Sequence, residues 1–166
     1  MEKFTVPNMR FSKEIRQLIR SAHITNLPIG LHEIKQIIER SGWEIYSYNV
    51  ASDIIEQYHL QEMADRNDAF SARIGNRFII FYSDNISQLD FPCILAHEIG
   101  HIVLEHLSDI DDIYAKERDC NCFAEELLNY TPLKFGVWAG AVIALSIIIV
   151  GSTYFIPKHN HFVIKD

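Results

Sequence analysis

The chain has 166 residues, the size of one globular domain with a short extension. Apolar residues make up 48% of it, which is enough for a buried core and excludes bulk disorder. The formal net charge of −7 and the lack of a Lys/Arg stripe argue against direct nucleic-acid binding, because phosphate contacts need a basic face.

The first half of the chain predicts two helices and a strand. Residues 12–22 place apolar side chains on one face of a helix, with Ser12 as its N-cap. Leu31 begins a second helix with the same spacing, and Gly42 stops it. Residues 43–50 are rich in aromatic and β-branched side chains, which favours a strand.

A helix over residues 52–65 and a hairpin come next. Residues 69–74 and 77–82 predict two strands joined at Gly75-Asn76, a tight-turn signal. Peptides often bind to an exposed strand edge, so the strand over 77–82 is a candidate for substrate pairing.

Two further helices carry the chemistry. Asp90 is a candidate N-cap for a helix that runs to about His106, with Pro92 tolerated in its first turn. The last helix of the domain is expected over residues 113–129. Together these elements predict an α+β domain with a small mixed or antiparallel sheet.

The first of these helices contains the motif His97-Glu98-Ile99-Gly100-His101. Residues four apart share a helix face, so His97 and His101 can offer two imidazoles to one zinc ion. Glu98 can take a proton from a metal-activated water during attack on a carbonyl, so it is the predicted catalytic residue. Gly100 is expected to keep bulk away from the metal.

A catalytic zinc needs a third protein ligand and one open position. Glu117 on the next helix is the candidate, with Asp119 as a competitor that faces away if Glu117 faces in. Asn121 shares the face of Glu117 and can hydrogen-bond the outer nitrogen of a ligating histidine. Cys93 shares a face with His97, but we predict a packing role for it.

The two motif segments, residues 94–104 and 117–128, resemble the ImmA/IrrE family of bacterial and phage metallopeptidases. That family carries an "AHELGH" helix followed by a helix of the form "E-x-x-C/A-N-x-F-A-x-x-L-L". The resemblance covers about residues 10–130 and implies a zincin-like fold. It also implies zinc ligands at His97, His101 and Glu117, a catalytic Glu98, and a protein substrate such as a helix-turn-helix repressor of a mobile element or stress regulon.

Residues 135–156 contain no charge over 22 positions. Roughly 20 apolar residues span a bilayer as a helix, so we predict a single transmembrane helix over 133–157 between a metallopeptidase domain, 1–132, and a tail, 158–166. Gly136 and Gly140 form a G-x-x-x-G pattern, which favours a homodimer through this helix.

The three cysteines make an odd count, and no apolar leader follows Met1. Both observations favour a reducing compartment, so we expect a single-pass protein of the cell membrane with a cytoplasmic catalytic domain and its tail outside. The alternative is a membrane-anchored regulatory module that binds zinc without proteolytic activity.

Overall fold

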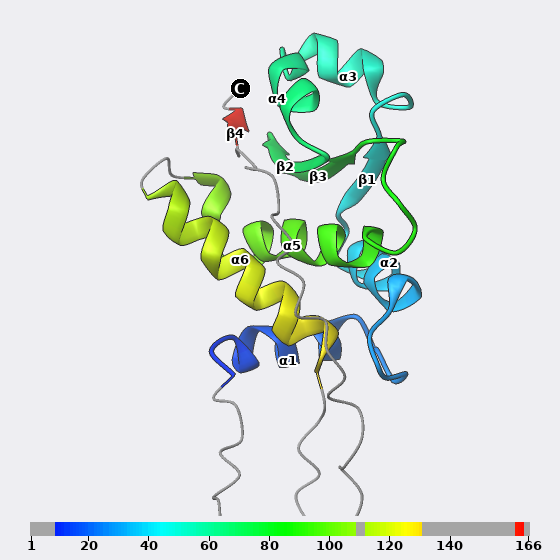
Figure 1. The fold of residues 1–166 in the computed structure, drawn as a ribbon, viewed down its shortest axis with the longest axis vertical. Helices are drawn as coiled ribbons and strands as arrows, with labels where there is room; N and C mark the ends of the chain where they lie inside the picture. The colour runs from blue at the N-terminus through cyan, green and yellow to red at the C-terminus, as the bar shows by residue number, and fades with distance from the viewer. Residues whose placement is uncertain (1–8, 109–111, 131–161, 165–166) are drawn as a thin grey trace, which may run out of the picture.

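The computed structural model describes residues 9–108, 112–130 and 162–164. Its elements alternate between helices and short strands (Figure 1), in the order α1 (Ser12–Ser21), α2 (Leu31–Arg40), β1 (Glu44–Ser47), α3 (Ser52–Gln57), α4 (Gln61–Arg66), β2 (Ala69–Ile74), β3 (Arg77–Tyr82), α5 (Phe91–Val103), the 3-10 helix η1 (His106–Ser108), α6 (Ile113–Leu128) and β4 (Phe162–Ile164). This mixed α+β architecture agrees with the class predicted from the sequence.

The strands form one mixed sheet in the order β1-β3-β2-β4. β2 and β3 are antiparallel, and they form the predicted hairpin with the predicted bounds and Gly75 at a positive φ of 59°. β1 is parallel to β3, and β4 is parallel to β2. The strand over 77–82 is therefore in the middle of the sheet, and our prediction that it offers an exposed edge is wrong.

Both faces of the sheet are covered, which explains why its strands are so apolar. Figure 1 shows α3 and α4 on one side and α5 on the other. Successive side chains alternate between these sides. Phe70, Ala72 and Phe81 pack in the core under α3 and α4, whereas Ile80 belongs to the core that contains α5. Ser71 is buried between Phe70 and Ala72 in the chain, so it points toward α5.

Helix α5 lies between the sheet and the layer made by α1, α2 and α6 (Figure 1). Its residues from Leu95 to Ile102 are all buried, so its polar side chains are inside the protein. α6 crosses α5 at Gly100, where an added Cβ would lie 3.2 Å from the Phe123 ring and 3.3 Å from Cys120 Cα. Gly100 thus permits close helix packing. A side chain at this position would point at α6, whereas the sequence analysis expected Gly100 to keep bulk away from a metal.

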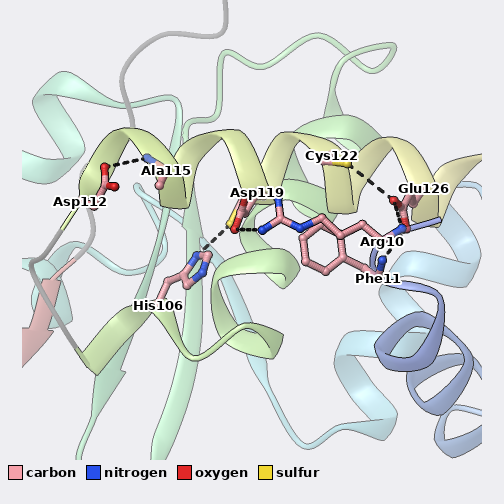
Figure 2. Close-up of polar contacts among 9 residues, drawn as sticks. Arg10, Phe11, His106, Asp112, Ala115, Asp119, Cys122 and Glu126 are labelled. Atoms are coloured by element: carbon pink, nitrogen blue, oxygen red, sulfur yellow. Dashed lines mark hydrogen bonds and ion pairs between the residues drawn. The ribbon is translucent and has the colours of Figure 1, made fainter. Parts of the chain in front are cut away.

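Arg10 and Phe11, near the N-terminal end of the described chain, hydrogen-bond two carboxylates of α6 (Figure 2). The Glu126 carboxylate accepts the backbone N–H groups of Arg10 and Phe11 at 2.7 and 2.8 Å. The Arg10 guanidinium donates to both carboxylate oxygens of Asp119 at 2.6 and 3.0 Å. At the other end, Asp112 is the N-cap of α6, and its side chain accepts the Ala115 N–H.

Some boundaries differ from the predictions. The helix expected over 52–65 is two short helices, because the chain turns at His59, whose φ is +56°. The motif helix ends at Val103 rather than near His106, since Glu105 also has a positive φ, of 59°. Asp90 stands at the N-cap of α5, but its side chain accepts from the Ser87 hydroxyl and not from the helix.

The predicted transmembrane helix, 133–157, lies outside the residues that the structure describes. Within those residues, no helix is both long enough and apolar enough to cross a bilayer. β4 comes from the predicted tail, and its register places Phe162 beside Ala72 of the domain's own sheet. The predicted position of the tail outside the membrane stays a prediction.

Candidate metal centre

The structure brings together the three side chains predicted as metal ligands. His97 and His101 project from α5 with their Nε2 atoms 3.0 Å apart. The two Glu117 carboxylate oxygens lie 3.3 Å from His97 Nε2 and 3.5 Å from His101 Nε2. The histidines are almost fully buried, with 2% and 0% exposure, whereas Glu117 is 19% exposed. The group therefore faces solvent on the α6 side.

Two of these separations, 3.3 and 3.5 Å, fit one zinc-sized ion, and the Nε2–Nε2 separation of 3.0 Å is slightly shorter. Two atoms bound at about 2.0–2.2 Å with a tetrahedral angle between them lie roughly 3.3–3.6 Å apart. All three ligand atoms of the group lie within 4.8 Å of one another. Two imidazoles and one carboxylate are a donor set that suits zinc and several other divalent metals. The geometry and chemistry of this group thus indicate a metal ion.

The electrostatics of the group favour a cation. Burial of the His97 ring acts against its protonated form, but the hydrogen bond that the ring donates to the Glu117 carboxylate and the charge of Glu98 outweigh burial, and the pKa of His97 is raised. The carboxylates that favour a proton on this ring also favour a metal ion beside it. Proton and metal therefore compete for the same nitrogen.

Asn121, the residue predicted to hydrogen-bond a ligating histidine, contacts His97. Its side-chain Oδ1 lies 2.9 Å from His97 Nδ1. A carbonyl oxygen can only accept, so Nδ1 must carry the proton in this contact. The lone pair of neutral His97 is then on Nε2, the atom that faces His101 and Glu117.

Glu98 is fully buried between α5 and the sheet. The Ser71 hydroxyl lies 2.7 Å from Glu98 Oε2 and 3.1 Å from the Glu98 carbonyl oxygen, and its single proton serves one of them at a time. The sequence analysis missed Ser71. Its signal was a polar residue between Phe70 and Ala72 in an otherwise apolar strand, at the position that alternation directs to the other face.

The competing ligand candidates lie elsewhere. The Asp119 carboxylate is engaged with Arg10, as expected if Glu117 faces the histidines. Cys93 is exposed and belongs to neither of the metal-competent groups found among the described residues. Cys120 is buried against Gly100. Burial and the carboxylates nearby raise the pKa of its thiol.

Comparison with known proteins gives one match. Residues 55–134, just under half of the chain, match the family model of a peptidase domain described as the IrrE N-terminal-like domain. The match supports the resemblance to the ImmA/IrrE family and indicates a metallopeptidase-like domain, and it spans both α5 and α6. Neither the curated proteins nor the solved structures contain a match to this chain.

The Asn121 contact makes a prediction about metal affinity. Asn121→Ala removes the acceptor of the His97 Nδ1 proton, so the affinity for zinc should fall by about 10- to 100-fold. Asn121→Asp keeps an acceptor at the same place and should retain most of the affinity. Competition titration against a chromophoric chelator measures both.

The matched control is Asn129→Ala, at the exposed C-terminal end of the same helix. It should bind zinc like the unaltered chain. Equal affinity for Asn121→Ala and Asn129→Ala would contradict the orienting role of Asn121.

Proposed function

We propose that this protein is a zinc-dependent metallo-endopeptidase that cleaves peptide bonds of a protein substrate. The observation that carries the proposal is the convergence of His97, His101 and Glu117 on one point, with Glu98 one residue away on α5. The peptidase family match over these helices supports it.

Each residue has a distinct role in this proposal. His97, His101 and Glu117 would hold the zinc ion, which supplies a Lewis acid that lowers the pKa of water. Glu98 accepts the proton of the attacking water and returns it to the amine nitrogen that leaves. The Ser71 hydroxyl holds the Glu98 carboxylate in position, and Asn121 holds the tautomer of His97.

The competing function is a regulatory module that binds zinc without cutting. A structural zinc site closes all four positions with protein ligands. The candidate group has three, within the part of the chain that the structure describes. A structural site also has no use for the carboxylate of Glu98, which follows His97 on α5 and is fully buried. Both features favour the peptidase.

The substrate is proposed from the family resemblance alone. We propose a helix-turn-helix repressor of a mobile element or stress regulon as the substrate class. The net charge of −7 agrees with a chain that binds the repressor itself and not the DNA to which the repressor binds.

The test uses the full chain loaded with zinc and a native bacterial cell extract as the probe. New protein N-termini are labelled and identified by mass spectrometry. We expect cleavage that a chelator abolishes and that Glu98→Gln lowers at least about 100-fold. Metal analysis should show about one zinc in Glu98→Gln at this site and loss of that zinc in Glu117→Ala.

Glu125→Gln is the matched control, since Glu125 is exposed on the same helix as Glu117. It should keep both zinc and activity. Zinc binding without any chelator-sensitive cleavage would contradict the peptidase and favour the regulatory module. Cleaved proteins that include no DNA-binding regulator would contradict the substrate class.

We further propose that the apolar run at 135–156 attaches the protein to the cell membrane, with the domain on the cytoplasmic side and a homodimer formed through Gly136 and Gly140. The full chain should then sediment with membranes at high salt, whereas a chain ending at residue 132 should not. The full chain should also cross-link as a dimer in detergent. A soluble full chain would contradict the anchor, and a strictly monomeric one the dimer.

A further inference from the structure

A second cluster of metal-binding side chains lies beside the first. His101, His106 and Cys120 each offer one ligand atom, and these atoms lie within 4.8 Å of one another. The Cys120 Sγ atom is 3.3 Å from His106 Nδ1. The rings of His101 and His106 meet edge to face, with centroids 5.5 Å apart. Neither His106 nor Cys120 has a role in the proposed peptidase reaction.

Three separate features of the fold assemble this cluster. His101 lies in the last turns of α5. The positive φ of Glu105 turns the chain so that His106, the first residue of η1, comes back toward α6. Figure 2 shows the His106 ring directed at a sulfur atom on α6. The close approach at Gly100 places Cys120 against α5.

The donor set of this cluster differs in kind from that of the first. It has a sulfur atom and two imidazoles, whereas the first group has two imidazoles and a carboxylate. Thiolate ligands favour soft or borderline cations such as zinc. Metal binding to a cysteine displaces the thiol proton into solvent, so the bound form is a thiolate.

The two groups share His101, and an imidazole has two nitrogens. Its Nε2 is the atom beside His97 and Glu117. Its Nδ1 is buried on the other side of the ring. One ring can therefore serve both groups, with one nitrogen for each, when metal binding displaces its remaining N–H proton into solvent and the ring binds as an imidazolate.

We propose that His101, His106 and Cys120 form a second site for a zinc-class divalent cation, which shares His101 with the first site. Occupancy of the second site changes the electron density of the His101 ring, and so it is coupled to the metal of the first site through that ring. The proposal is independent of proteolysis, because it requires metal binding alone.

Cobalt reports on this site, since a cobalt–thiolate bond gives a charge-transfer absorption that histidine and carboxylate ligands do not. The metal-free full chain is titrated with Co²⁺. We expect two equivalents to bind and the thiolate band to appear. Cys120→Ser should lose the band and one equivalent. Cys122→Ser, two residues away on α6 and outside the cluster, should keep both.

Two more variants make the result decisive. Circular dichroism shows whether Cys120→Ser folds like the unaltered chain. If it does not, His106→Gln is the variant that should fold and lose the second equivalent. Glu117→Ala should keep the thiolate band and lose the first equivalent, so failure of the peptidase site is seen separately. A wild-type titration without a thiolate band would overturn the proposal and leave the Cys120–His106 contact as packing. Persistence of the band in Cys120→Ser would overturn it as well.

Discussion

The candidate centre depends on how closely α6 packs against α5. The two histidines are fixed by their spacing on one helix, but Glu117 comes from another. A side chain at position 100 would meet the Cys120 backbone at 3.3 Å and push α6 outward. A shift of about 1 Å is enough to spoil a metal site, since ligand distances vary by only about 0.2 Å. By letting α6 approach α5, Gly100 thus determines where Glu117, the third candidate ligand, lies.

The sheet supplies the polar partner of Glu98. β2 and β3 are buried on both faces, and alternation along β2 gives Phe70 and Ala72 to one core and Ser71 to the other. The buried Glu98 carboxylate needs a polar partner. Ser71 donates to it from the face of the sheet that α5 covers. The proposed catalytic base, Glu98, is therefore held by a strand residue that precedes it by 27 positions in the chain.

The sequence predicted the local features well and the tertiary ones in part. The hairpin was predicted to the residue because a tight Gly-Asn turn fixes its register. The metal-ligand spacing was visible because a helix repeats every 3.6 residues. The central place of β3 was missed, since strand order depends on contacts far apart in the chain. Ser71 and His106 were missed for the same reason, because each meets its partner through the fold.

The most direct test of the account is anomalous diffraction at the zinc edge from crystals of the full chain grown with zinc. The account predicts a peak within about 2.2 Å of His97 Nε2, His101 Nε2 and a Glu117 oxygen, with no fourth protein ligand on that ion. The absence of a peak between these side chains, or a peak closed by a fourth protein ligand, would contradict it.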